Sequence, residues 1–303
     1  MSYGYLKKWI ILQPIYLIFI RTRVKSGLQI YLTIIKRLAS EYNLSGLKPL
    51  SNLSYNYVLS GFLGNRPIIL KLGLDNDALK QEASSLQAFA EFGGIKVLVA
   101  KKGFLLLEKA IPGISLKSYF PLQDNDSVEI ACNIINLLHQ APIPKNPQFP
   151  DIQDWLRSLD HDTSNKNLKN YLQKARYIRN QLLATAPDPV LLHGDLHHEN
   201  IIKHGDNWVV IDSKGVTGEP AYEVAAFIRN PIPELLKSRN MASIINNRIA
   251  YFAYKLKIKP ERIEGWCFVQ AVLAWVWILE DGGNEKCFKY LVEILADCLA
   301  NNK

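Results

Sequence analysis

The ten-residue segment LLHGDLHHEN, which ends at Asn200, constrains what this chain can fold into more than any other part of the sequence. Residues 201–203 have the pattern of a short strand, and residues 208–211 have that of a second, more apolar strand after a turn. An antiparallel hairpin brings its open ends together, so Asn200 is predicted to lie beside Asp212. Asp195 opens the loop that enters the hairpin, and these three oxygen-bearing side chains are therefore expected to converge on one small volume.

These side chains predict a site for a hard cation. Carboxylate and carboxamide oxygens, few in number and with room for water, suit Mg²⁺ better than zinc. Four histidines in the same stretch raise zinc as an alternative, but no two of them are predicted to have the helical geometry of an H-x-x-x-H pair. His193 is instead predicted to hold the loop by hydrogen bonds, as a packed histidine does.

The pattern His193-x-Asp195-x4-Asn200, followed by Asp212, resembles the catalytic segment of protein-kinase-like phosphotransferases. The resemblance implies that Asp195 acts on the acceptor hydroxyl as a base and that Asn200 and Asp212 are metal ligands. A hairpin with incidental polar residues is the competing interpretation. The three residue identities and the hairpin length argue against it.

Composition places the chain among globular proteins of a reducing compartment. Its 303 residues are 48% apolar and 21% charged, which is ample for a core and typical of two domains or one bilobed unit. The four cysteines are dispersed and include no C-x-x-C pair. They predict free, mostly buried thiols and a cytoplasmic location.

The net charge of +8 raises the question of a nucleic-acid partner. Five of the basic residues lie in the first 25 positions, which contain no acidic residue. The sequence has no RNA-binding motif and no interleaving of aromatic and basic residues suited to stacking on bases. A solvated basic surface is therefore predicted, with no nucleic-acid partner and no obligate protein partner.

Residues 1–26 form an apolar and basic extension ahead of the predicted domains. Residues 9–20 are nearly all apolar and have positive charge on both sides, but they include Gln13 and Pro14. They fall short of the roughly 20 residues that span a bilayer, and no small-residue cleavage site follows them. Three interpretations stay open: an interfacial anchor giving weak membrane association, an additional packed helix, or a start codon assigned too far upstream.

Hydrophobic spacing predicts a strand-rich region followed by a helical one. The first has a helix at 28–42, paired strands at 57–62 and 67–72, a helix from Leu79 to the glycines at 93–94, and paired strands at 96–100 and 103–108. This describes a small sheet with one helix. Beyond Gly113 the expected helices are 128–139, 152–159, 168–184 and the residues from Pro233 onward, with the hairpin as the exception.

Two segments of the helical region stand out. Residues 141–150 are rich in proline and are predicted to be a surface loop. Residues 266–279 are apolar nearly all round, but at fourteen residues they predict a buried core helix and not a membrane span.

Further residues resemble parts of a kinase nucleotide site. Lys71 ends an apolar strand and Glu82 lies on the next helix, like the lysine and glutamate that steady ATP phosphates in kinases. The stretch around Glu108 and Ala110 resembles the hinge between kinase lobes, which implies that the Glu108 carbonyl and the Ala110 amide contact adenine. A glycine-rich G-x-G-x-x-G loop is absent, and its equivalent would be residues 51–56.

A closer resemblance rests on five longer segments. They are His193–Ile202, Ile211–Gly215, Gly218–Glu223, Arg229–Pro231 and Trp275–Gly282. These segments are similar to the aminoglycoside/hydroxyurea antibiotic resistance kinases, the streptomycin 6-phosphotransferase branch of the aminoglycoside phosphotransferases. The resemblance covers roughly residues 27–300. Ser213 departs from the family, where proline is expected after the metal-binding aspartate.

The resemblance implies an α+β, protein-kinase-like bilobed fold with ATP and Mg²⁺ as cofactors. A small β-rich N-terminal lobe is expected at 27–108, a hinge at 109–113, and a larger, mostly helical catalytic and substrate lobe at 114–303. Asp195 would be the base, Asn200 and Asp212 the metal ligands.

The function implied is ATP-dependent phosphorylation of a hydroxyl on a small cationic molecule, an aminoglycoside such as streptomycin. Candidate carboxylates for the cation, each of which also fits a solvated surface acid, are Asp160, Asp162, Glu280 and Asp281. Two alternatives stay open. One is a kinase of a housekeeping alcohol of the choline, sugar or homoserine type, and the other is a non-catalytic kinase-like binding module.

Overall fold

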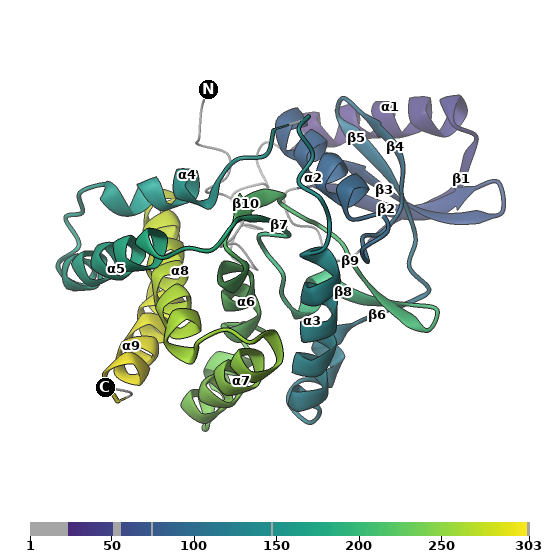
Figure 1. The fold of residues 1–303 in the computed structure, drawn as a ribbon. Coiled ribbons are helices and arrows are strands. Elements are labelled where there is room, and N and C mark those ends of the chain that lie inside the picture. Colours follow the sequence, from purple (N-terminus) through teal and green to yellow (C-terminus); the bar gives the residue numbers. More distant parts are fainter. Residues whose placement is uncertain (1–23, 51–55, 74, 147, 302–303) are drawn as a thin grey trace. The chain divides into compact units, whose positions relative to one another are not determined.

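A computed structural model describes residues 24–50, 56–73, 75–146 and 148–301 (Figure 1). The chain divides into two compact units. Of the described residues, unit 1 contains those up to Ala83 together with Lys96–Lys109. Unit 2 contains Ser84–Ile95 and the described residues from Ala110 onward.

Two expectations fall outside the described residues. The apolar stretch at 9–20 is one of them, so its three interpretations stay open. The loop expected at 51–56 is the other, apart from Asn56.

Unit 1 is built on an antiparallel sheet in the order β1-β2-β3-β5-β4. Its strands are β1 (Leu44–Pro49), β2 (Tyr57–Leu63), β3 (Arg66–Leu72), β4 (Val97–Lys101) and β5 (Phe104–Glu108). β2 and β3 pair from Tyr57 opposite Leu72 to Leu63 opposite Arg66. Gly64 in the connecting turn has a φ of 59°, which glycine adopts without a steric penalty. The two hairpins predicted in this region are confirmed.

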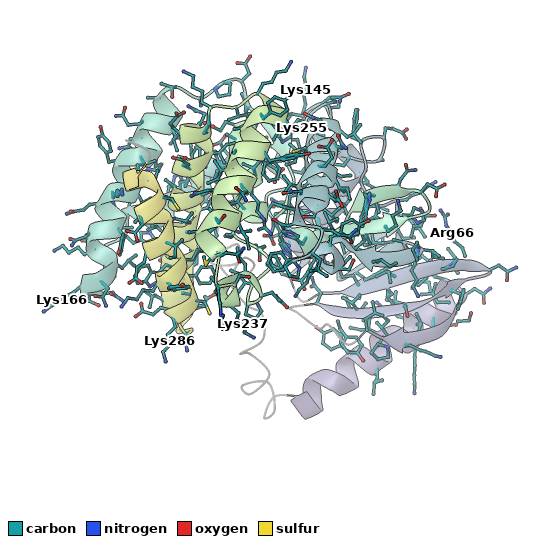
Figure 2. The ribbon with its side chains drawn as sticks, turned by 90° about the horizontal axis from the view of Figure 1, so that it is seen from below. Arg66, Lys145, Lys166, Lys237, Lys255 and Lys286 are labelled. Carbon is teal, nitrogen blue, oxygen red and sulfur yellow. The ribbon has the colours of Figure 1, made fainter. Side chains whose placement is uncertain are left out.

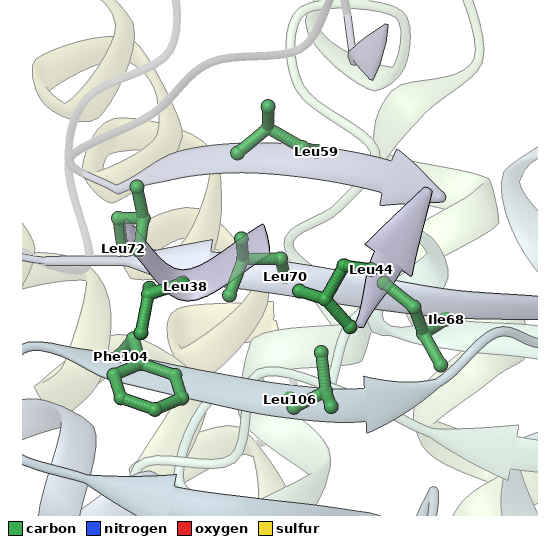
Figure 3. Close-up of a cluster of buried hydrophobic side chains, with 8 residues drawn as sticks. All are labelled: Leu38, Leu44, Leu59, Ile68, Leu70, Leu72, Phe104 and Leu106. Atoms are coloured by element: carbon green, nitrogen blue, oxygen red, sulfur yellow. The ribbon is translucent and has the colours of Figure 1, made fainter. Parts of the chain in front are cut away.

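The two faces of this sheet carry different chemistry because strand side chains alternate. Leu70 and Leu72 of β3 belong to a buried cluster with Leu38 of α1 (Val24–Glu41), as Figure 3 shows. The rest of the cluster is Leu44, Leu59, Ile68, Phe104 and Leu106. Lys71 lies between the two leucines in sequence, so its side chain leaves the opposite face, where it meets α2 (Asn76–Ala88).

Unit 2 contains two small sheets. One has the order β6-β8-β9 and the other pairs β10 with β7. The strands are β6 (Pro112–Ser115), β7 (Val190–Leu192), β8 (Ile201–His204), β9 (Asn207–Val210) and β10 (Val216–Gly218). β8 and β9 form the predicted hairpin, with Ile201 opposite Val210.

The rest of unit 2 is mostly helical, as predicted (Figure 1). Its α-helices are α3 (Asp124–Leu138), α4 (Ile152–Leu156), α5 (Lys166–Ala184), α6 (Pro220–Ile228), α7 (Met241–Leu256), α8 (Pro260–Glu280) and α9 (Lys286–Asn301). Short 3₁₀ helices are η3 (Leu116–Tyr119), η4 (Arg157–Asp160), η5 (His198–Asn200) and η6 (Leu235–Lys237).

Helix α8 forms the centre of this unit. It packs against α5, α6, α7 and α9. By length and composition it could cross a membrane, but 89% of its apolar window is buried inside the protein. Pro260 occupies its first turn, where the missing N–H costs no hydrogen bond. The predicted buried core helix at 266–279 is confirmed.

Some elements escaped prediction. The predicted sheet consisted of two hairpins, whereas the observed sheet has a fifth strand, β1. β1 contains Gly46 with a φ of 60°, and its register with β2 shifts between Ser45 and Lys48, so regular alternation is lost. α6 was also missed, because residues 221–228 are all buried and show no polar face with helical spacing.

The surface and the thiols match the compositional expectations. Cys132, Cys267 and Cys298 are buried and free, and Cys287 is exposed and free. Exposed lysines come from several elements of unit 2, and Figure 2 shows their side chains pointing outward. The labelled ones are Lys145, Lys166, Lys237, Lys255 and Lys286.

Protonation of the partly buried His139 should weaken the fold in acid. Burial lowers the pKa of His139 from 6.5 to about 4. A depressed histidine pKa contributes stability above pH 6.5, and this contribution is lost as the pH falls toward 4. His139→Phe should therefore reduce the loss of unfolding free energy between pH 7.5 and 4.5 by about 2–3 kcal/mol. Urea unfolding at several pH values measures this, and parallel pH curves for variant and wild type would contradict it.

Candidate active site

The loop between β7 and β8 carries the predicted base. Asp195 lies three residues after β7, and Asn200 ends η5 directly before β8. The Ile211 amide donates to the Asn200 carbonyl at 3.0 Å, which extends the hairpin ladder by one residue. Asp212 follows with a φ of 59°. The hairpin thus brings the chain around Asn200 next to the chain that leads into Asp212.

His193 is a packed residue that fixes this loop. Its side chain is fully buried, and its Nε2 lies 2.8 Å from the Ile211 carbonyl. Its Nδ1 accepts from the Asp195 amide at 3.3 Å. Burial lowers the pKa of His193 to about 4, so the ring is neutral. The predicted hydrogen-bonding role of His193 is confirmed.

Glu223 of α6 holds the same loop from its other side. Its two carboxylate oxygens accept from the amides of His193 and Gly194 at 2.6 and 3.0 Å. Burial raises the pKa of Glu223 to about 7, although both amides favour the charged form. Sequence reasoning missed this residue. An acid inside an otherwise apolar segment was the available signal.

Gly194 occupies a position that only glycine fits. Its φ is 82°, and an added Cβ would lie 2.8 Å from Cη2 of Trp155 and 3.0 Å from Cγ1 of Val216. Gly194→Ala should lower the unfolding free energy by about 1–3 kcal/mol from strain alone, and further from the clash.

The matched control is Gly205→Ala, because Gly205 has a φ of 56° and no atom within 4 Å of an added Cβ. Urea unfolding should show the larger loss for the Gly194 variant. Equal losses would mean that the contact with Trp155 relaxes freely.

Asp195 lies in a buried, mixed electrostatic setting. Burial raises its pKa from 3.8 to about 6, while Lys214 and Arg229 oppose that shift. Arg229 Nη2 is 3.9 Å from Oδ1 of Asp195, and His197 Nε2 is 3.7 Å from Oδ2. Burial lowers the pKa of His197 to about 4, so this second contact is not an ion pair at neutral pH. A carboxylate with such a pKa can accept a proton from a hydroxyl near neutral pH.

Arg229 is a second residue that sequence reasoning did not assign. It caps the C-terminus of α6, and its Nη1 donates to Gln270 of α8 at 2.7 Å. Gln270 in turn donates to the Tyr222 carbonyl at 2.6 Å. The guanidinium beside Asp195 is therefore held by two helices. In the sequence, Arg229 was marked only by its position in the family-like segment Arg229–Pro231.

The side chains of Asn200 and Asp212 have the chemistry of magnesium ligands. Asn200 Nδ2 donates to the Asp195 carbonyl at 2.9 Å, which leaves its Oδ1 as the atom suited to a cation. Asp212 is partly exposed, and its Oδ2 contacts Lys214 Nζ at 2.8 Å. A carboxamide oxygen and a partly exposed carboxylate are hard donors of the kind that fit Mg²⁺.

Lys71 and Glu82 form a buried ion pair in unit 1. Lys71 Nζ lies 2.6 Å from Glu82 Oε2, and the side chains are 9% and 2% exposed. The pair links β3 to α2, as the side-chain alternation along β3 requires. A buried lysine held in this way presents a fixed positive charge, and its contact with phosphate remains a prediction.

The two residues expected to contact adenine, Glu108 and Ala110, would do so through main-chain atoms, which make few demands on the type of side chain. Glu108 ends β5, where its amide donates to the Lys96 carbonyl at 2.9 Å. Its carboxylate accepts from Arg66 at 2.8 Å. Ala110, two residues later, is buried. Their main-chain contacts with a nucleotide remain predictions.

The candidate carboxylates for a cationic acceptor already have protein neighbours or face solvent. Asp160 pairs with Arg179 at 2.8 Å, and Glu280 contacts His161 at 2.9 Å. Asp162 is exposed. These contacts fit the interpretation of surface acids at least as well as that of acceptor ligands.

Comparison with solved structures defines the fold. The chain matches choline kinase LicA from Streptococcus pneumoniae with a TM-score of 0.66 and 16% identity, over 90% of this chain and 99% of that one. It matches a thermostable mutant of aminoglycoside phosphotransferase APH(4)-Ia, in ternary complex with AMP-PNP and hygromycin B, with a TM-score of 0.68 and 15% identity, over 88% of this chain and 98% of that one. The predicted α+β, protein-kinase-like fold is confirmed.

Sequence comparison then gives the family. Residues 63–282 match the aminoglycoside/hydroxyurea antibiotic resistance kinases, and the chain belongs to that family. It is 28% identical to streptomycin 3''-kinase of Klebsiella pneumoniae over 63% of this chain and 72% of the relative. It is 20% identical to streptomycin 6-kinase of Streptomyces griseus over 70% and 71%. The protein is therefore a small-molecule kinase.

Proposed function

We propose that this kinase transfers the γ-phosphoryl group of ATP to a hydroxyl of an aminoglycoside such as streptomycin. The observation that carries the proposal is the buried Asp195 in one short loop with Asn200, held by His193 and Glu223. The streptomycin kinases among the relatives supply the acceptor class.

Each residue of the loop has a defined task in this reaction. Asp195 orients the acceptor hydroxyl and takes its proton as the oxygen attacks phosphorus. Arg229 keeps the Asp195 carboxylate charged until the proton moves. Mg²⁺ on Asn200 and Asp212 would offset charge on the phosphate oxygens. Most of the acceleration then comes from positioning and electrostatics.

The nucleotide is assigned to residues of unit 1 and the connecting segment. Lys71, fixed by Glu82, binds ATP phosphate oxygens, and the main chain at Glu108 and Ala110 contacts the adenine edge. This assignment includes the expected division into a nucleotide-binding lobe at 27–108, a hinge at 109–113 and a catalytic lobe at 114–303. A cytoplasmic location, where ATP and reduced thiols coexist, is part of the proposal.

The test is ADP release by the full chain with Mg-ATP and streptomycin. Streptomycin-dependent turnover that is lost in Asp195→Asn supports both the chemistry and the acceptor class. If ADP is not released with streptomycin but is released with choline, homoserine or a sugar, the protein is a kinase whose acceptor is a housekeeping alcohol. Silence with every acceptor and no binding of Mg-ATP would leave a non-catalytic module.

A further inference from the structure

A buried arginine that the proposed reaction does not use contacts the loop formed by residues 195–200. Arg248 of α7 is 1% exposed. Its Nε and Nη2 donate to the two carboxylate oxygens of Asp124 on α3 at 2.9 and 2.5 Å. Its Nη1 donates to the carbonyls of Phe227, Ile228 and Asn230. One side chain therefore connects α7 to α3 and to the C-terminal end of α6.

The same guanidinium reaches the catalytic loop through His198. Arg248 Nη2 lies 3.4 Å from His198 Nε2. A guanidinium has no acceptor atom, so Nε2 is the accepting nitrogen and the ring proton is on Nδ1. The ring stacks on Phe227 with centroids 3.8 Å apart. His198 is thus held between an aromatic ring and a cation, three residues after Asp195.

Two further contacts restrain this part of the loop. Ser115 Oγ donates to the His198 carbonyl at 2.9 Å. Lys117 pairs with Glu199 at 3.1 Å. His198 and Glu199 both lie between Asp195 and Asn200 in the chain, so movement of His198 would change the separation of the proposed base and the proposed metal ligand.

The carbonyls that Arg248 binds belong to the end of α6 that presents Arg229. Arg229 is the cap residue of that helix, and its guanidinium lies 3.9 Å from Asp195. Arg248 therefore restrains Asp195 along two routes, through His198 in the loop and through the end of α6. Its five N–H groups are well matched to this task, because a planar fork can bind partners in several directions at once.

We propose that Arg248, fixed by Asp124, is a positioning residue that sets the geometry of the 195–200 loop against the end of α6. It touches neither ATP nor acceptor. The effect on turnover rests on the proposed function of Asp195, whereas the effect on the loop itself does not.

The test compares Arg248→Lys with Arg262→Lys. Arg262 makes a similar link, since it pairs with Glu219 at the start of α6 and donates to the Leu182 carbonyl at 2.7 Å. Lysine keeps the charge in both variants but cannot span several partners. We expect Arg248→Lys to lower kcat about 10- to 100-fold with KM for ATP near the wild-type value, as outer-shell partners do. Arg262→Lys should leave kcat near wild type.

The double variant Arg248→Lys/His198→Phe tests whether Arg248 affects kcat through His198. If Arg248 acts through His198, the double variant should lose little more kcat than Arg248→Lys alone. Should Arg248→Lys fail to fold, Asp124→Asn takes its place, because it leaves the arginine but removes its carboxylate. Thermal unfolding of each variant verifies that it is folded.

Hydrogen exchange provides a readout independent of activity. The amides of Asp195, Glu199 and Asn200 donate within the loop, and their exchange should quicken in Arg248→Lys and not in Arg262→Lys. Equal exchange and equal kcat in the two variants would overturn the inference. If the wild type turns over no acceptor, the proposed function fails, and the exchange comparison alone decides the role of Arg248.

Discussion

Asp195→Asn should lower kcat by at least about 10²–10⁴-fold, the range attributed to proton transfer by a positioned base. Asparagine keeps the size of the side chain but cannot take a proton from the acceptor hydroxyl. The Asp195 carbonyl still accepts from Asn200, and the Asp195 amide still donates to His193, because both contacts involve the main chain. The loop should therefore retain its shape, and the affinity for ATP, measured by calorimetry, should change little.

The control for this change is Asp206→Asn. Asp206 is exposed in the turn of the β8–β9 hairpin, so the same chemical change occurs close in sequence but far from the base. Wild-type turnover in this control and loss in Asp195→Asn would identify the carboxylate as the cause. Full activity of Asp195→Asn would refute the assignment of Asp195 as the base.

Lys71→Met should lower kcat about 10²–10³-fold, because the proposed assignment places the fixed positive charge of Lys71 on the phosphate oxygens and this charge is removed. The variant also deprives the buried Glu82 carboxylate of its lysine partner at 2.6 Å. Breaking a buried pair from one side costs about 3–5 kcal/mol of stability. Loss of turnover alone would therefore not separate catalysis from unfolding.

The double variant Lys71→Met/Glu82→Gln resolves this ambiguity. It removes the charge that Lys71→Met leaves behind, so urea unfolding should show recovery of stability without recovery of turnover. Arg66→Met is the matched control on the same strand, since Arg66 pairs with Glu108 and these two side chains are 41% and 25% exposed. Such a pair contributes at most about 1 kcal/mol. Return of turnover in the double variant would show that Lys71 acts only on stability.

Sequence patterns correctly predicted the elements whose structure depends on residues close together in the chain. The β8–β9 hairpin has a short turn between apolar runs, and α8 is a long apolar segment ended by Asp281 and Gly282. The pairing of Lys71 with Glu82 followed from a resemblance, and the alternation of side chains along β3 explains why the two meet.

The features that were not predicted depend on contacts between residues distant in the sequence. Glu223 lies 30 residues after His193, and no local periodicity connects a helical carboxylate to two loop amides. Arg229 lies 3.9 Å from Asp195 while its guanidinium also donates to Gln270 of α8, 41 residues later in the chain. β1 is a strand through its pairing with β2 and not through its own alternation. Tertiary packing, not propensity, sets these features.

The burial of α8 has a consequence for synthesis on the ribosome. Residues 266–279 of this helix are apolar nearly all round, and α9 is one of the elements that cover α8. Until α9 has left the ribosome, a newly made chain exposes a segment long and apolar enough to be mistaken for a membrane span. Chaperone binding and the speed of translation through residues 281–301 should therefore affect the yield of active kinase more than changes of similar size elsewhere in the chain.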